Sequence, residues 1–322
     1  MSDVAHHRRG HDHAHHQPSG PRREQRLAIA IGLNVGIVAA QIAAGIWSGS
    51  MGLLADAGHN LTDVLALTVS LVAVRLAALP RSGRRSFGWH RATVLAALFN
   101  AAMIIAVCAF VVVESIGRLR DPQPVDGGIV IVMALLGALF NTVAAFVVAD
   151  RSGDVNMRGA LLHLVSDAAT SVAVAATGIV MVVTDGTYWL DPAIALAISV
   201  LIAWQGWRLA KQALDILLES TPEGLDPEAV TAAMAGVAGV DAVHDLHAWS
   251  LSSELRALSA HVVLSGHPTL EQAQVVGERI KAQLARDFSI AHTTLELECE
   301  PCSTDPSCDA EPAGAASKHL HG

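Results

Sequence analysis

Two short motifs inside apolar segments carry the residues best suited to chemistry. His59 and Asp63 stand four residues apart in "GHNLTD", and His163 and Asp167 repeat the spacing in "HLVSD". On a helix, residues at this spacing share one face, and ionisable side chains in a membrane span are costly enough to suggest a function. Two imidazoles and two carboxylates supply the four donors of a tetrahedral Zn²⁺ site. The pattern predicts a metal site shared by two helices; the alternative is a pair of helix-stabilising contacts in a bundle interior.

A metal site of this kind would also exchange protons. Histidine binds metal when neutral and aspartate when ionised, so metal binding displaces protons. A site that opens in turn to each side of a membrane would then work as a metal/proton antiporter. Asp56, three residues before His59, either accepts a hydrogen bond from the imidazole or lies at the mouth of the pore. Zn²⁺ would be the substrate, with Cd²⁺ and Co²⁺ as alternatives for the same donors, and we expect no organic cofactor.

The segments that hold these motifs are long enough to cross a lipid bilayer. The chain is 52% hydrophobic and 16% charged, with a mean hydropathy of +0.43, and a spanning helix needs about 20 apolar residues. Six apolar blocks meet this length approximately. They cover residues 27–47, 52–75, 92–116, 127–148, 159–184 and 190–210. The sequence predicts a polytopic α-helical membrane protein with six transmembrane helices over residues 27–212.

The distribution of Lys and Arg predicts the orientation of these helices. The loops "RSGRRSFGWHR" and "DRSGDVNMRG" are basic, as is the segment before the first block, whereas "SGS", "DPQPVDGG" and "TDGTYWLDP" contain no Lys or Arg. Arg118 and Arg120 are the exception. Because basic loops stay in the cytoplasm, both termini are expected there. Compact loops and a short leader favour a bacterial inner membrane.

Two polar regions flank the membrane segment. Residues 1–26 form a leader predicted to be disordered, with six histidines suited to weak metal binding: His6, His7, His11, His13, His15 and His16. Residues 221–322 hold 15 acidic and 5 basic side chains, which argues against nucleic acid as a partner. Within them, 221–302 are expected to form a small α+β domain of order α-β-β-α-β, its first helix capped by Asp226. Residues 303–322 are expected to be disordered.

Several motifs together resemble the zinc-transporting branch of the cation diffusion facilitator family of metal/proton antiporters. They are "GSMGLLADAGHNLTD", "SFGWHRATVLAALFNA", "LLHLVSDAATSV", "VHDLHAWSL", "LSAHVVL" and "HTTLELE". The resemblance covers about residues 24–302. It implies six membrane helices, a cytoplasmic ferredoxin-like domain, a homodimer, and a transport site made of the two His-x-x-x-Asp motifs. One departure is Gln41, where many relatives have glutamate.

The resemblance also implies a second metal site in the cytoplasmic domain. Its candidate ligands are His244, His261, His292 and Glu298. Strand alternation places His292 and Glu298 on one face of the final strand, together with Glu296 and Glu300. Cys299 and Cys302 form a C-x-x-C pair that either binds metal or lies free in a frayed end. His90 is a weaker candidate, from a loop that holds an additional site in some relatives.

Two other classes of protein could carry the same metal ligands as a transporter. A membrane metalloenzyme would need an open metal position and a bound water, and the H-E-x-x-H signature is absent. We therefore expect no enzymatic activity. A metal sensor would bind the ion at the same four ligands without moving it, and only a flux measurement separates that reading from transport.

Overall fold

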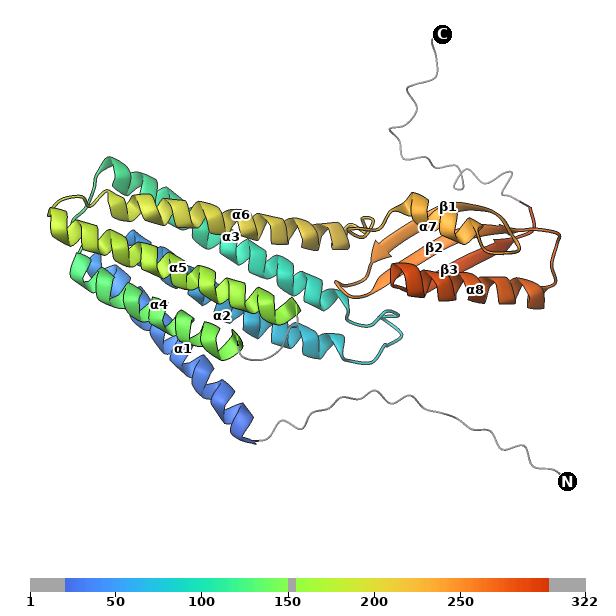
Figure 1. The fold of residues 1–322 in the computed structure, drawn as a ribbon, viewed down its shortest axis with the longest axis horizontal. Helices are drawn as coiled ribbons and strands as arrows, with labels where there is room; N and C mark the ends of the chain where they lie inside the picture. The colour runs from blue at the N-terminus through green and yellow to red at the C-terminus, as the bar shows by residue number, and fades with distance from the viewer. Residues whose placement is uncertain (1–20, 150–154, 301–322) are drawn as a thin grey trace, which may run out of the picture.

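The computed structural model describes the backbone of residues 21–149 and 155–300, with side chains in 35–146 and 161–300. Six long helices form a bundle, and a small α/β domain follows at one end of it (Figure 1). The helices are α1 (Pro21–Ser48), α2 (Met51–Ala77), α3 (Arg91–Arg120), α4 (Gly127–Ala149), α5 (Val155–Thr184) and α6 (Leu190–Leu217). We call the end of the bundle beside the α/β domain the near end, and the opposite end, where α2, α4 and α6 begin, the far end.

The helices have the composition of membrane spans. In the described part of the chain, α2 to α6 each contain a segment long and apolar enough to cross a bilayer, and the apolar part of α1, Val35–Ser48, is shorter. Large apolar side chains such as Phe110, Val113 and Phe146 face outward from the bundle. A soluble protein rarely exposes so much apolar surface, so the chain is an integral membrane protein.

The helices pack closely where small residues allow it. α3 lies along α6 and α4 along α5, while α2 contacts helices on both sides. A Cβ atom at Gly178 would lie 3.2 Å from the carbonyl oxygen of Gly127, and one at Gly127 would lie 2.9 Å from that of Gly178. The two backbones therefore approach to a distance that only glycine permits, as is common between membrane helices.

The start of α2 is fixed at the far end by a carboxylate from α6. Asp191 accepts hydrogen bonds from the backbone N–H groups of Met51 (2.5 Å) and Gly52 (3.2 Å), and from the hydroxyl of Ser50 (2.5 Å). The first N–H groups of a helix have no partner inside it, so this carboxylate satisfies two of them. It also ties α2 to α6 about two turns before the His-x-x-x-Asp motif.

Arg118, which breaks the charge pattern of the loops, has local partners. Its guanidinium donates hydrogen bonds to Glu114, four residues earlier, and to the backbone carbonyl of Gly49. These contacts join the end of α3 to the turn between α1 and α2.

The C-terminal domain has the order predicted from the sequence. Its elements are α7 (Pro227–Ala235), β1 (Val240–Ser250), β2 (Arg256–Leu264), α8 (Leu270–Phe288) and β3 (Ile290–Glu298). β1 pairs with β2 antiparallel, and β2 pairs with β3 in parallel through the crossover helix α8. The predicted cap is present, since the Asp226 side chain accepts from the backbone N–H of Glu228. A core around Met234, Leu258 and Ile280 packs the helices against the sheet.

Some boundaries differ from those expected. α1 begins at Pro21, so residues 21–26, assigned above to the leader, are helical; proline suits the first turn of a helix because its missing N–H is not needed there. α6 continues to Leu217, beyond residue 212. The leader histidines, Cys302, Cys308 and the tail lie outside the described residues.

Candidate metal-transport site

The two His-x-x-x-Asp motifs meet in the interior of the bundle. His59 Nε2 lies 3.6 Å from Asp63 Oδ2 and 3.3 Å from Asp167 Oδ1. His163 Nε2 lies 3.3 Å from Asp63 Oδ2 and 3.5 Å from Asp167 Oδ2. One ligand atom from each of the four residues lies within 4.8 Å of the other three.

These separations suit a four-coordinate metal ion. Donors about 2.05 Å from Zn²⁺ in a tetrahedron lie about 3.3 Å from one another. The four contacts between histidine nitrogen and carboxylate oxygen, at 3.3–3.6 Å, are close to that value. The two imidazole rings stand nearly perpendicular, at 88°, with centroids 5.8 Å apart. Small adjustments of the side chains would therefore bring all four donors onto one ion.

The exposure of the four side chains changes along the bundle axis. The side chains of His163 and Asp63 are 47% and 26% exposed, whereas those of His59 and Asp167 are 11% and 7% exposed. In each helix the more exposed ligand is the one toward the near end. The two ligands toward the near end are therefore more exposed than the two toward the far end.

Asp56 occupies neither of the positions expected for it. It is 1% exposed, so it does not lie at a pore mouth. The Nδ1 atom of His59 has no hydrogen-bond partner in the described structure, so Asp56 does not orient that ring through a hydrogen bond. Its carboxylate instead accepts hydrogen bonds from the Gln41 amide (3.0 Å) and the Ser171 hydroxyl (3.0 and 3.2 Å). Spacing on α2 alone gave no sign of these partners, which come from α1 and α5.

A second group of ligand-type side chains lies on the sheet of the C-terminal domain. His244 Nε2 is 2.9 Å from Glu298 Oε2, and His261 Nδ1 is 2.8 Å from Glu298 Oε1. His244 and His261 are cross-strand partners in β1 and β2, and their ring centroids are 5.1 Å apart. The sheet thus brings together three of the four side chains that the sequence suggested.

Two acidic residues extend this group: Glu296, which strand alternation placed on the same face as Glu298, and Asp245, which the sequence analysis did not assign to it. His261 Nε2 lies 3.6 Å from Asp245 Oδ2 and 3.5 Å from Glu296 Oε2. Asp245 has a φ of 48° and belongs to an irregular stretch of β1 between His244 and His247. Because that bulge interrupts strand alternation, regular spacing could not predict where Asp245 points. His247, in turn, contacts Asp245 at 2.9 Å.

Comparison with known proteins agrees with this arrangement. Residues 27–218 match the family model described as the cation efflux transmembrane domain, and residues 222–300 match that of the cation efflux protein, cytoplasmic domain. The chain belongs to the cation efflux family. The match extends over both parts of the molecule, so the resemblance seen in the sequence is confirmed.

Curated relatives of this cation efflux protein align over nearly their whole length. It is 34% identical over 317 residues to the metal cation efflux system protein CzcD of Cupriavidus metallidurans, which covers 97% of this chain and 98% of the relative. It is 32% identical over 317 residues to the zinc transporter ZitB of Escherichia coli, covering 97% and 99%. It is 30% identical over 298 residues to the cadmium, cobalt and zinc/H(+)-K(+) antiporter of Bacillus subtilis, covering 92% and 95%.

The remaining candidate ligands of this cation efflux protein lie apart from the two groups. His292, at the other end of β3 from Glu298, packs edge-on against Phe87 with ring centroids 5.3 Å apart. Cys299 is exposed and not in a disulfide, and its predicted partner Cys302 is not described. His90 stands at the start of α3, outside the two groups of ligand-type residues found in the described chain.

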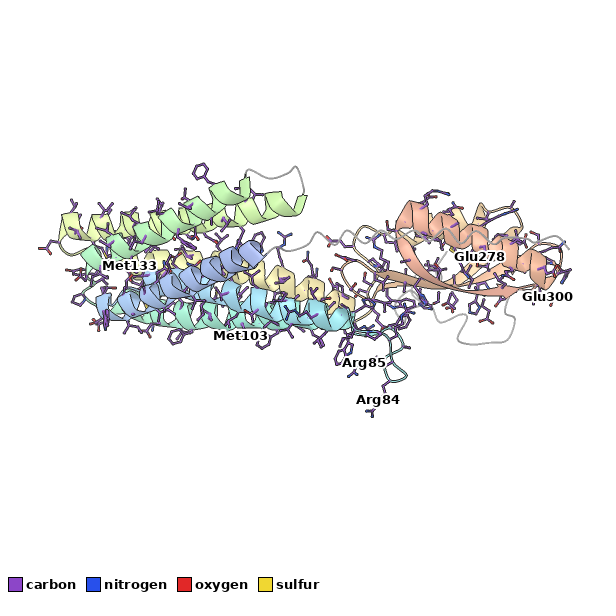
Figure 2. The ribbon with its side chains drawn as sticks, turned by 90° about the horizontal axis from the view of Figure 1, so that it is seen from below. Arg84, Arg85, Met103, Met133, Glu278 and Glu300 are labelled. Atoms are coloured by element: carbon purple, nitrogen blue, oxygen red, sulfur yellow. The ribbon has the colours of Figure 1, made fainter. Side chains whose placement is uncertain are left out.

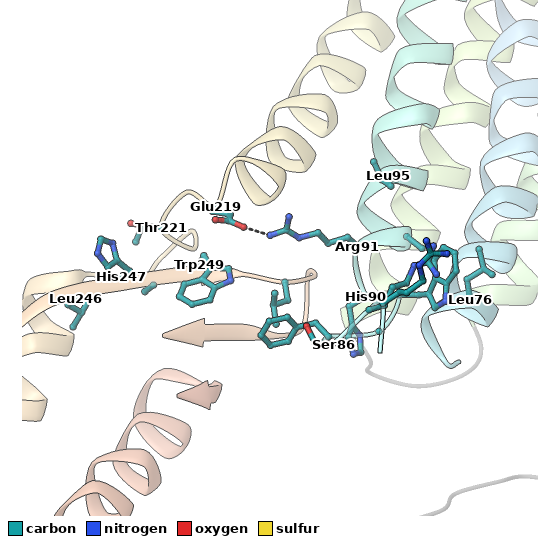
Figure 3. Close-up of a pocket in the computed structure, with 18 residues that line it drawn as sticks. Leu76, Ser86, His90, Arg91, Leu95, Glu219, Thr221, Leu246, His247 and Trp249 are labelled. Carbon is teal, nitrogen blue, oxygen red and sulfur yellow. Dashed lines mark hydrogen bonds and ion pairs between the residues drawn. The ribbon is translucent and has the colours of Figure 1, made fainter. Parts of the chain in front are cut away.

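His90 lines a large cavity where the helical bundle of this cation efflux protein meets the C-terminal domain. The cavity has a volume of about 1000 Å³ and is bounded by the loop between α2 and α3, the end of α6 and strand β1. Arg91 reaches across it from the start of α3 to Glu219 after α6, at 2.5 Å (Figure 3). Arg84 and Arg85 project from the same loop at this junction (Figure 2), and the guanidinium of Arg85 lies 3.6 Å from the ring centroid of Trp89.

Proposed function

We propose that this protein exports divalent metal ions, mainly Zn²⁺, across a membrane in exchange for protons. The observation that carries the proposal is the convergence of His59, Asp63, His163 and Asp167 at separations close to those of a tetrahedral zinc shell. The names of relatives support it, since they describe a zinc transporter and a cadmium, cobalt and zinc/H(+)-K(+) antiporter. We propose transport rather than catalysis, in keeping with the family.

Proton exchange follows from the chemistry of the ligands. The imidazoles must give up their protons, and the carboxylates must be ionised, before all four can bind one cation. A site that is loaded with metal from one side and with protons from the other transports both in opposite directions. Alternating access would come from rocking of helices around this fixed site, as in other secondary transporters.

We propose that the near end faces the cytoplasm of a bacterial cell and that both termini lie there. The basic loop before α3 lies at this end, as the distribution of Lys and Arg requires. The exposure of His163 and Asp63 then corresponds to the state that takes up metal from the cytoplasm. The proposal includes α1 as a sixth span, which its length of 28 residues permits.

We further propose that the C-terminal domain is a ferredoxin-like module that binds Zn²⁺ and joins two chains into a homodimer. The ligands would be His244, His261 and Glu298, with Asp245 and Glu296 around His261. The model that matches residues 222–300 carries the short name ZT_dimer, which supports the dimer. Metal bound here would report cytoplasmic zinc to the membrane part.

A second proposal concerns which divalent ions the transport site accepts. Two nitrogen and two oxygen donors suit Zn²⁺, Cd²⁺ and Co²⁺ alike. The name of the Bacillus subtilis relative includes all three ions. We propose that this protein also carries Cd²⁺ and Co²⁺, with Zn²⁺ preferred.

The proposed function is tested by zinc flux into sealed liposomes that hold the purified protein under an imposed pH gradient. We expect gradient-dependent flux in the wild type, its loss in Asp63→Ala, and unchanged flux in Asp287→Ala, a surface carboxylate of α8. Isothermal titration of the same preparations measures binding. Zinc bound by the wild type with no flux at any gradient would overturn transport and favour a sensor.

A further inference from the structure

A buried polar cluster lies next to the candidate transport site, and none of its side chains is one of the four metal ligands. Asp56 on α2 is 1% exposed, and Gln41 on α1 and Ser171 on α5 are both 0% exposed. The Gln41 amide and the Ser171 hydroxyl donate hydrogen bonds to the Asp56 carboxylate at 3.0 Å. Within the described chain, no Lys, Arg or His forms an ion pair with Asp56. A buried carboxylate held only by neutral donors is unusual, because burial of an unpaired charge is costly.

The cluster lies on the far side of the four ligands. Asp56 precedes His59 by three residues, a displacement of about 4.5 Å along the helix toward the far end. Ser171 follows Asp167 by four residues on the antiparallel helix α5, a displacement of about 6 Å toward the same end. The cluster therefore occupies the level of the bundle next to the four ligands on their far side.

The cluster joins four helices at that level. Gln41 belongs to α1, Asp56 to α2 and Ser171 to α5, and Gly137 on α4 completes the enclosure. A Cβ atom at Gly137 would lie only 2.6 Å from Gln41 Nε2 and 3.4 Å from Ser171 Oγ. These four helices lie together in the bundle (Figure 1). A larger side chain at this position would have to displace the Gln41 amide, so the polar groups and the backbone of α4 pack closely at this level of the bundle.

Burial increases along the path from the near end to the cluster. His163 and Asp63 are partly exposed, His59 and Asp167 are nearly buried, and the cluster is fully enclosed. The two ligands toward the near end are exposed without any change at Asp56, whereas toward the far end the hydrogen-bonded side chains around Asp56 fill the adjacent level of the bundle. Once these hydrogen bonds open, the freed carboxylate is the nearest anionic group outside the four-ligand site.

We propose that Gln41, Asp56 and Ser171 form the outer gate of the transport path, and that the Asp56 carboxylate is the next group to contact the outgoing cation. This inference rests on the proposed function. In the closed state two neutral donors satisfy the carboxylate; in the open state the cation replaces them. The gate is therefore stable without metal and opens toward a positive charge that arrives from His59 and Asp167.

Three variants separate the two parts of this proposal. Asp56→Asn keeps the volume of the side chain and removes its charge. Gln41→Ala with Ser171→Ala keeps the charge and removes the donors. Ser115→Ala is the matched control, because Ser115 is a fully buried hydroxyl on α3 without a hydrogen-bond partner. Each protein is assayed for Zn²⁺ binding by titration, for flux in liposomes, and for thermal stabilisation by Zn²⁺ as a check of folding.

We expect Asp56→Asn to bind Zn²⁺ with wild-type affinity and stoichiometry and to lose flux at least about tenfold, as the cost of one buried charge contact suggests. Wild-type flux in this variant would overturn the role of the carboxylate. Loss of Zn²⁺ binding would also overturn it, because Asp56 would then belong to the binding site itself. Absence of flux in the wild type would instead refute the proposed function, so the two failures are distinguishable.

The gating part is tested by labelling from the far side. Asn141→Cys, one turn of α4 from Gly137 toward the near end and 8% exposed in the wild type, is introduced in a background with the four native cysteines replaced by alanine. A membrane-impermeant maleimide is then added on the side of the far end. We expect slow labelling, accelerated about tenfold by the Gln41→Ala/Ser171→Ala pair and unchanged by Ser115→Ala. Equal labelling rates in all three proteins would show that the cluster only packs the helices and does not gate.

Discussion

His59 Nε2 lies 3.3 Å from Asp167 Oδ1, although 108 residues separate the two along the chain. The reciprocal contact, from His163 Nε2 to Asp63 Oδ2, has the same length. Each histidine therefore faces a carboxylate of its own helix and one of the other helix. The site exists only while α2 and α5 lie side by side, so any tilt of one helix against the other changes both cross-helix contacts together. Metal affinity is thereby coupled to the packing of the bundle.

Removal of one carboxylate from this site should abolish transport. In Asp167→Asn the amide keeps the size of the side chain but is a poor ligand for Zn²⁺. We expect the affinity for Zn²⁺ to fall at least about 100-fold, since even residues that only orient ligands contribute 10- to 100-fold, and flux to be lost. Titration and liposome flux measure both effects. Asp185→Asn, in the left-handed turn between α5 and α6, is the control and should leave both unchanged.

Exchange of a nitrogen donor for an oxygen donor should shift selectivity. His163→Asp would turn a set of two nitrogens and two oxygens into one nitrogen and three oxygens, which suits Mn²⁺ better than Zn²⁺. We expect the ratio of Zn²⁺ to Mn²⁺ affinity to fall about tenfold or more, by competition titration. His267→Asp, in an exposed turn with a φ of 50°, is the control. An unchanged ratio in His163→Asp would mean that His163 does not ligate the ion.

Each half of the candidate metal site could be predicted from the sequence because its rule is local, whereas the meeting of the two halves depends on the packing of α2 against α5. Spacing of four residues on a helix places His59 beside Asp63 whatever else the chain does, and the repeat at His163 supplies the other half. The sequence did not show which side chains of α1 and α5 reach Asp56. Such contacts depend on how helices are rotated and offset against each other, which local periodicity does not encode.

The C-terminal site shows the same limit in a sheet. Strand alternation places His292, Glu296 and Glu298 on one face of β3, and the regular register from His292 to Glu298 agrees with this, but alternation does not show how far apart they lie. His292 lies six residues before Glu298, about 20 Å along a strand, and packs against Phe87 of the α2–α3 loop instead. Asp245 was missed because the irregularity in β1 changes which way it points.

The ion pair that bridges the junction cavity should contribute little to stability. Arg91 and Glu219 are 42% and 59% exposed, so water screens their attraction. Pairs of this kind are worth about 1 kcal/mol or less. We therefore expect Glu219→Gln to change the unfolding free energy by no more than this and to retain zinc flux. A double-mutant cycle with Arg91→Gln measures the coupling, and a coupling well above this range would show that the pair is a stronger link than its exposure implies.

The buried carboxylate at the far end should matter far more. Asp191 is 1% exposed and accepts hydrogen bonds from two backbone N–H groups of α2 and from Ser50. Asp191→Asn would leave at least one of these donors without an acceptor, at a cost of about 1–3 kcal/mol. We expect a lower melting temperature in detergent. Asp126→Asn is a suitable comparison, because Asp126 also accepts backbone N–H groups at a helix start but is exposed; equal effects of the two substitutions would contradict the importance of burial.

The cluster on the sheet predicts a second class of bound zinc that is separable from transport. His261 contacts Glu298 through Nδ1 and both Asp245 and Glu296 through Nε2, so its removal withdraws the one side chain that all three acids share. We expect His261→Ala to bind fewer zinc ions per chain than the wild type, by equilibrium dialysis and metal analysis of the full-length protein, while the transport-site affinity is kept. His292→Ala is the matched control, because His292 lies apart from the cluster and should leave the stoichiometry unchanged. If His292→Ala lost zinc and His261→Ala did not, the ligands would have to be reassigned to the opposite end of β3.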